Sequence, residues 1–118
     1  CHSMKSTGNA MNDDNGKSRP DIVISDHDGL TSTFEVTQQV AQIFTAMGYQ
    51  VGINNPYKGA ELIRKYANPA IRRYSLQIEL NRALYMHEDS FIKNESFTKI
   101  AQDLQRFTEL MSLHLLEA

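Results

Sequence analysis

The most informative stretch of the sequence is Arg73-Tyr74-Ser75-Leu76-Gln77-Ile78-Glu79-Leu80. Apolar and polar side chains alternate along it, which is the period of a β-strand with one buried face. The apolar positions are Tyr74, Leu76, Ile78 and Leu80, and the polar positions are Ser75, Gln77 and Glu79. The pattern therefore predicts a strand whose polar face presents Gln77 and Glu79 for chemistry.

Two further strands and one helix are predicted upstream. Residues 21–25 are a β-branched run typical of a buried strand, and residues 26–29 break it as a turn. Residues 32–35 match a capping box, in which the Ser32 hydroxyl and the Glu35 carboxylate satisfy free backbone N–H groups at a helix start. Gly48 ends this helix, and residues 49–54 alternate as a strand. The apolar face of the helix is Val36, Val40, Ile43, Phe44 and Met47.

Helical segments are predicted in the rest of the chain. Residues 59–66 have helical spacing and are closed by Asn68-Pro69, and residues 81–85 open a helical turn directly after the informative strand. A long final helix then carries the apolar stripe Phe97, Ile100, Ala101, Leu104, Phe107, Met111 and His114.

Strands that alternate with helices predict an α/β fold, with a mainly parallel or mixed sheet flanked by helices and room for an antiparallel edge strand. In such sheets ligands bind outside the carboxyl ends of the strands. Asp26 and Glu79 both lie at predicted strand ends. We therefore expect the functional site at this edge of the sheet.

Length and charge limit the function classes. The 118 residues fit one domain, in which residues 3–19 are predicted to be a flexible loop and regular structure to begin after Pro20. The 12 basic and 14 acidic residues provide no electrostatic footprint for nucleic acid or an anionic membrane. No apolar run is long enough for a membrane span, the first residues lack a signal peptide, and the lone Cys1 fits a reducing compartment. We expect a cytoplasmic protein.

Four segments resemble the carboxyl-terminal half of the N-formylglutamate amidohydrolase family. They are residues 1–4, 19–23, 55–59 and, most specifically, the run Leu76-Gln77-Ile78-Glu79-Leu80-Asn81-Arg82-Ala83-Leu84-Tyr85-Met86. The resemblance implies a zinc-carboxypeptidase-like fold and hydrolysis of N-formyl-L-glutamate to formate and L-glutamate. It also implies that His2 completes a zinc site, or that of another divalent metal, whose other ligands lie in an upstream half. The chain is then expected to be the carboxyl-terminal part of a longer protein.

A role in amide hydrolysis follows for the polar face of the strand. Zinc held by three protein ligands can lower the pKa of a bound water to about 7, and a neighbouring carboxylate can then take its proton. Glu79 suits this general-base role because a strand fixes its backbone, and Gln77 is placed to orient substrate or to hold Glu79. Without the resemblance, Glu79 would be an ordinary polar strand residue.

Four other residues are candidates for substrate binding, each with a structural alternative. Arg82 can pair with a substrate carboxylate or with a structural one. Asn81 can support that arrangement or cap the following helix. Tyr57 lies in a loop that can close over substrate or simply form a turn, and Asp26 can orient a ligand although its surroundings indicate a solvated turn.

Two alternatives to N-formylglutamate hydrolysis remain open. The sequence departs from the family pattern at His27, Ala60 and Tyr74, which allows a different acyl substrate. The absence of a second or third metal ligand also allows a non-catalytic α/β binding or assembly module. Exposed sheet edges would favour self-association or association with the missing amino-terminal half.

Overall fold

The computed structural model describes the main chain of residues 1–117 and the side chains of residues 1–114. Its helices are α1 (Phe34–Ala46), α2 (Glu61–Tyr66), α3 (Phe97–Glu117) and the short 3₁₀ turns η1 (Pro69–Ile71) and η2 (Arg82–Leu84). Its strands are β1 (His2–Met4), β2 (Ile22–Ser25), β3 (Val51–Ile53), β4 (Gln77–Asn81), β5 (Met86–His87) and β6 (Ile92–Lys93). No helix in the described part of the chain is long and apolar enough to cross a bilayer.

The main sheet is mixed, which confirms the predicted α/β class. Its four strands follow the order β1-β4-β2-β3, with β1 parallel to β4 and β2 parallel to β3. The antiparallel pair, β2 with β4, lies in the centre of the sheet rather than at an edge. It arises because the chain after β3 passes through α2 and η1 back to the end of β2, where the Ser75 N–H donates to the Thr31 carbonyl (2.9 Å). β4 therefore starts where β2 stops.

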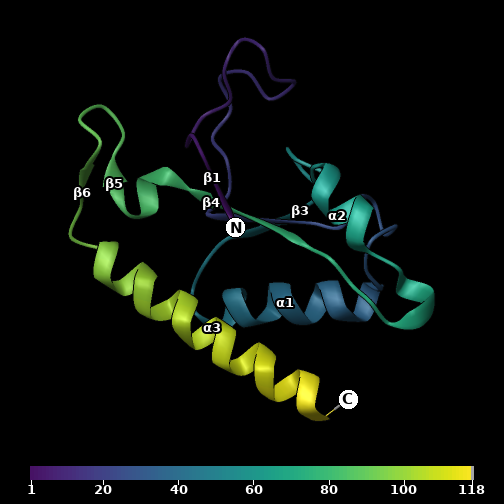
Figure 1. Cartoon of the computed structure of the whole chain (residues 1–118). Helices are drawn as coiled ribbons and strands as arrows, with labels where there is room; N and C mark the ends of the chain where they lie inside the picture. Colours follow the sequence, from purple (N-terminus) through teal and green to yellow (C-terminus); the bar gives the residue numbers. More distant parts are fainter. Residues whose placement is uncertain (118) are drawn as a thin grey trace.

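Helices α1 and α3 cover one face of the sheet, and α2 lies on the other face together with the loop that follows β1 (Figure 1). The core between the sheet and α1 contains Ile22, Ile24, Val40, Phe44 and Leu80. Helix α3 extends it through Leu104, Phe107 and Met111. The Phe44 and Phe107 rings stack with centroids 4.5 Å apart. This packing leaves the opposite face of β4 free for polar side chains.

The alternation predicted for β4 is confirmed, although the strand is shorter than predicted. Leu76, Ile78 and Leu80 pack toward the core. Gln77 and Glu79 bond to each other on the other face. Regular pairing begins at Gln77 instead of Arg73. Residues 73–75 instead belong to the segment that leads from η1 into β4, where the Arg73 N–H donates to the Asn68 carbonyl (3.1 Å).

The predicted start of α1 is wrong by one residue. Thr33, in extended conformation, is the N-cap, and its hydroxyl accepts from the Val36 N–H (3.3 Å). The Ser32 hydroxyl donates instead to the Thr33 carbonyl (3.4 Å). Ser and Thr are both good N-caps, so sequence cannot choose between two adjacent hydroxyls. The predicted helix end is confirmed, because Gly48 takes φ +98° after the C-cap Met47.

The prediction that regular structure begins only after Pro20 is wrong. Strand β1 occupies His2–Met4, and the loop after it folds back so that Thr7 forms an isolated bridge with Ser18. Two bonds across the loop, Gly8 N–H to the Lys17 carbonyl (3.1 Å) and Gly16 N–H to the Gly8 carbonyl (2.9 Å), support the bridge. A three-residue strand has no detectable period, so its pairing with β4 is invisible in sequence. Flexibility of residues 3–19 remains a prediction.

Candidate active site

His2 and Glu79 meet on one face of the sheet. Strand β1 runs parallel to β4 in the register that pairs His2 with Glu79. The His2 Nδ1 atom lies 3.4 Å from Glu79 Oε1. The two residues that sequence reasoning placed at one site are thus brought together by backbone pairing between segments far apart in the chain.

Gln77 holds the same carboxylate from within β4. Its Nε2 donates to Glu79 Oε1 (3.2 Å), and its Oε1 accepts from the Ala60 N–H (3.1 Å). The side chain is buried, so both bonds form away from bulk water. Gln77 therefore links Glu79 to the backbone just before α2, which corresponds to the predicted role of holding Glu79.

Glu79 is buried, and one of its oxygens has no partner in the part of the chain that the structure describes. The residue is 6% exposed, and Oε2 forms no hydrogen bond with any described residue. Burial raises the pKa of Glu79 above its ordinary value, and the neighbouring charges of His2 and Arg19 offset part of the rise. An unpartnered carboxylate oxygen costs free energy when buried, and such groups concentrate where proton transfer takes place. Oε2 is accordingly the candidate proton acceptor.

The segment that leads into α2 packs closely on the site face. Gly59 takes φ +110°, and a Cβ at this position would clash with the Ile63 side chain and lie 3.6 Å from the Ser25 Cβ. The Ser25 hydroxyl in turn donates to the Tyr57 carbonyl (2.7 Å). Only glycine combines this backbone conformation with this close approach. Gly59 thus allows residues 57–63 to lie directly over β2.

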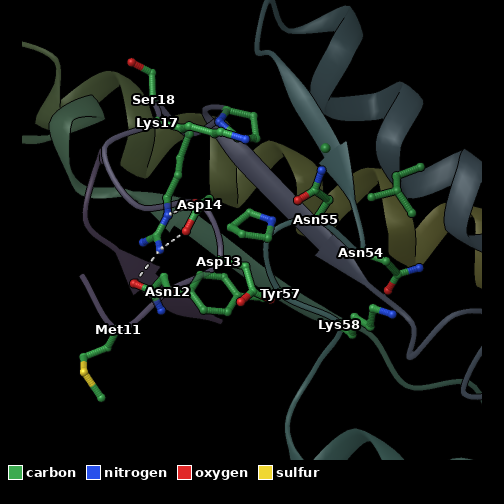
Figure 2. A pocket seen from close by; sticks show the side chains of 15 residues that line it. Met11, Asn12, Asp13, Asp14, Lys17, Ser18, Asn54, Asn55, Tyr57 and Lys58 are labelled. Atoms are coloured by element: carbon green, nitrogen blue, oxygen red, sulfur yellow. Dashed lines mark hydrogen bonds and ion pairs between the residues drawn. The ribbon is translucent and has the colours of Figure 1, made fainter. Parts of the chain in front are cut away.

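A polar cleft of about 820 Å³ lies between the loop that follows β1 and the segment that follows β3. Its first wall is formed by residues 11–20, and its second wall by residues 52–58 (Figure 2). Neither His2 nor Glu79 lines the cleft, whereas Arg19 does and its charge acts on Glu79. The Asn81 amide, one pleat beyond Glu79 in β4, donates to the Arg19 carbonyl (3.3 Å). Asn81 and Arg19 thus connect β4, the strand that carries Glu79, to the cleft.

The other predicted site residues have different surroundings. Tyr57 lines the cleft, with its ring centroid 5.0 Å from the Arg19 guanidinium carbon. The Arg82 Nε donates to the Ser3 hydroxyl (3.2 Å), and in the described part of the chain Arg82 forms no ion pair with a carboxylate. Asn81 caps η2, since its Oδ1 accepts from the Ala83 N–H (3.0 Å). The capping alternative left open by the sequence is therefore the arrangement seen.

Asp26 is engaged away from the Glu79 pair. Its Oδ1 accepts from the Gly29 N–H (2.8 Å) and from Asn54 Nδ2 (2.7 Å), and its Oδ2 accepts from the Thr37 hydroxyl of α1 (2.7 Å). The residue is 5% exposed, so the expectation of a solvated turn is wrong for this side chain. Antiparallel pairing explains its position, because the end of β2 lies beside the start of β4 rather than beside Glu79.

Arg19 is the site residue that sequence reasoning missed. Its side chain is 3% exposed and pairs with Asp14 through Nε–Oδ2 (2.8 Å) and Nη2–Oδ1 (3.2 Å). The ion pair raises the pKa of Arg19 and lowers that of Asp14. Residues 19–23 were noticed only as part of a resemblance. An arginine directly before a proline and a buried strand is a weak signal, since nothing local shows its burial.

The described residues could supply only part of the ligands of a divalent metal ion. Among the residues that the structure describes, no group of three or more His, Cys, Asp or Glu side chains could hold a metal ion. The His2 side chain is 53% exposed and lies beside Glu79 Oε1, while Glu79 Oε2 has no hydrogen-bond partner among the described residues. Because catalytic zinc takes three protein ligands, the described residues fit one ligand and an adjacent base but not a complete site.

On one face of the mixed α/β sheet, a buried carboxylate and a histidine face each other. The chain belongs to the N-formylglutamate amidohydrolase family, whose model matches residues 1–86. It is 34% identical over 73 residues to an N-formylglutamate deformylase of Pseudomonas putida. This match covers 62% of the chain and 25% of the relative.

A solved structure extends the likeness to nearly the whole chain. The crystal structure of N-formylglutamate amidohydrolase from Ralstonia eutropha JMP134 superposes with a TM-score of 0.88 at 34% identity. The match covers 98% of this chain and 43% of that one. The chain thus spans less than half the length of these relatives, and the predicted carboxypeptidase-like fold is confirmed.

Proposed function

We propose that the protein hydrolyses the amide bond of an N-acyl amino acid, with N-formyl-L-glutamate as the substrate and formate and L-glutamate as the products. Family membership and the names of the two relatives support this reaction. The single observation that carries it in the chain itself is Glu79: buried, in register with His2, and with Oε2 unpartnered.

Glu79 acts in this proposal as the general base. Its Oε2 takes a proton from the attacking water while the water oxygen forms a bond to the formyl carbon. The same proton then passes to the amide nitrogen as the C–N bond breaks, so that formate and the free amine leave. A raised pKa brings the carboxyl nearer to neutral pH, where it can both accept and return a proton. Gln77 keeps Oε1 in place and leaves Oε2 to react.

His2 is proposed as one ligand of a zinc ion or another divalent metal. When bound, such an ion would polarise the formyl carbonyl and lower the pKa of the attacking water. The remaining ligands would come from outside the described residues, because these contain no group of three suitable side chains. His2 supports this role by its exposed imidazole and by its pairing with the strand that carries the base.

Arg82 is proposed to bind a substrate carboxylate. Only its Nε is engaged, by the Ser3 hydroxyl, so among the described contacts its two terminal nitrogens remain available. A guanidinium binds a carboxylate through two parallel hydrogen bonds. Tyr57 and the rest of the cleft would receive the amino acid part of the substrate.

The proposal is tested by assaying formate release from N-formyl-L-glutamate by the full-length polypeptide and by measuring its metal content. N-acetyl- and N-succinyl-L-glutamate are tested beside it through release of L-glutamate, the product common to the three substrates, since His27, Ala60 and Tyr74 depart from the family pattern. We expect release from the formyl substrate and bound zinc. Hydrolysis of the N-acetyl or N-succinyl compound alone would change the assigned substrate. Hydrolysis of none of the three compounds would contradict the proposed enzymatic function.

A non-catalytic binding or assembly module is the second candidate. The lack of a three-ligand group among the described residues favours it. It predicts a well-folded full-length polypeptide with no stoichiometric metal and no hydrolysis. The same two measurements therefore separate the candidates.

A further inference from the structure

Arg19 joins the two walls of the cleft. Its guanidinium donates to Asn12 Oδ1 (3.1 Å) and pairs with both Asp14 oxygens, all in the first wall. Figure 2 draws these bonds as dashed lines that end at Asn12 and Asp14. The same guanidinium lies over the ring of Tyr57 in the second wall, 5.0 Å from its centroid. A cation at this distance is attracted by the face of an aromatic ring.

Among the described residues, Arg19 makes the side-chain polar contacts that connect the two walls directly. Apart from the contacts of Arg19, no hydrogen bond or ion pair joins residues 11–20 to residues 52–58 in the described structure. Pro20 also lies close to Gly52, without a polar contact. Each wall is otherwise held by its own bonds to the sheet, such as the bond from the Ser25 hydroxyl to the Tyr57 carbonyl, so Arg19 is the polar link between them.

Arg19, which bridges the two walls, is anchored to β4, the strand that carries Glu79. The Asn81 amide donates to the Arg19 and Pro20 carbonyls (3.3 Å each), and the Arg19 N–H donates to the Ser6 carbonyl (2.8 Å). Nη1 also donates to the Lys5 carbonyl (3.3 Å). Arg19 is thus held at its backbone and its side chain, and a shift of the cleft walls relative to β4 would break several of these bonds.

We propose that Arg19 is a positioning residue that holds the two walls of the cleft at the spacing the substrate needs, and so determines substrate affinity; this rests on the proposed function. The Arg19 side chain is only 3% exposed, so it acts through the residues that it contacts. Substrate that enters between residues 11–20 and residues 52–58 then meets a preformed cleft, and little binding energy goes to ordering the walls.

The first test is Arg19→Gln in the full-length polypeptide, with Arg106→Gln as the matched control. Arg106 pairs with Glu109 on the exposed side of α3, far in sequence from the cleft. We expect KM for N-formyl-L-glutamate to rise by about 10-fold or more in Arg19→Gln while kcat stays within about threefold, the signature of lost ground-state binding. The control should keep both constants. An unchanged KM, or a fall in kcat alone, would overturn the proposal.

Arg19→Lys separates the effect of the guanidinium contacts from the effect of the positive charge. Lysine keeps the positive charge but cannot form the forked contacts to Asn12 and Asp14 while lying flat on Tyr57. We expect the KM of Arg19→Lys to rise almost as far as that of Arg19→Gln. Full rescue by lysine would show that charge alone matters and would overturn the bridging role.

A double-mutant cycle with Tyr57→Leu tests whether the two walls act through Arg19. If they do, Arg19→Gln/Tyr57→Leu raises KM no further than the more severe single variant, whereas independent residues have additive free energies. Additivity would contradict the proposal.

Hydrogen exchange of the backbone amides in residues 52–58 gives a readout that does not depend on activity. The exchange should be faster in Arg19→Gln than in the wild type, and unchanged in Arg106→Gln. Absence of formate release by the wild type would contradict the proposed function. Unchanged hydrogen exchange in Arg19→Gln would contradict the bridging role of Arg19.

Discussion

His2 and Glu79 are directly paired residues on neighbouring parallel strands, with His2 Nδ1 3.4 Å from Glu79 Oε1. Residues in such a pair share one face of the sheet, so the strand pairing keeps the two side chains adjacent. The main-chain register thus brings the imidazole within reach of the carboxylate. It places an imidazole against one carboxylate oxygen and leaves the other oxygen free to take a proton.

Glu79→Gln is expected to lower kcat of the full-length polypeptide by roughly 100-fold or more, because an amide of the same shape cannot act as a base. Steady-state formate release measures the effect. The melting temperature should not fall, since the change removes a buried carboxylate whose Oε2 has no partner.

Glu109→Gln is the control for this substitution. Glu109 lies half exposed on α3 and pairs with Arg106 at 3.4 Å. Surface pairs of this kind contribute less than about 1 kcal/mol, so the control should keep full activity and stability. A Glu79→Gln enzyme as active as the Glu109→Gln enzyme would exclude Glu79 from the mechanism.

Gln77→Leu is expected to lower kcat by roughly 10- to 100-fold, the scale of losing a residue that orients a functional side chain. Leucine is similar in size but removes the bonds to Glu79 Oε1 and to the Ala60 N–H. Gln105→Leu, on the exposed side of α3, is the matched control and should leave kcat unchanged. If both variants behaved alike in the formate assay, Gln77 would have no positioning role.

The sequence was informative where one short segment carries its own pattern. The alternation around Ile78 was enough to place Gln77 and Glu79 together on the polar face, and Gly48 was enough to end α1. These features depend on the local period of apolar residues and on local backbone conformation, and both are determined by residues close together in the sequence.

Features that depend on distant pairing could not be read in this way. Strand β1 has three residues, and its register with β4 is set by main-chain bonds across most of the chain. Arg19 is buried by a loop and by Tyr57, and β2, α1 and β3 lie between these two residues in the sequence. In a mainly parallel sheet Asp26 and Glu79 would lie at the same edge, but the antiparallel pairing of β2 with β4 places the end of β2 beside Gln77, at the start of β4.

Gly59→Ala is expected to destabilise the protein by about 1–3 kcal/mol, the cost of strained backbone together with overpacking. The new methyl group would clash with Ile63 at a position whose φ is +110°. Gly29→Ala is a useful comparison, because Gly29 has φ +86° but open space around its Cβ position. Urea denaturation of both variants should show the larger loss for Gly59→Ala, and equal losses would show that the contact with Ile63 adds nothing.

Asp26→Asn is expected to remove a part of the stability that depends on pH. Burial acts to raise the pKa of Asp26, but hydrogen bonds from Asn54, Thr37 and the Gly29 N–H together lower it below the ordinary value. A carboxyl whose pKa is lower in the folded state stabilises the fold above its unfolded pKa of about 3.9, and this contribution is lost as pH falls through the folded value.

The difference in unfolding free energy between wild type and Asp26→Asn should therefore be largest near neutral pH, about 1–3 kcal/mol, and should shrink below about pH 4. Urea denaturation over a series of pH values measures it. Asp28→Asn is the control, since its pair with Lys58 is exposed and should matter little at any pH. A constant difference across the pH range would mean that Asp26 acts through its shape and not through its charge.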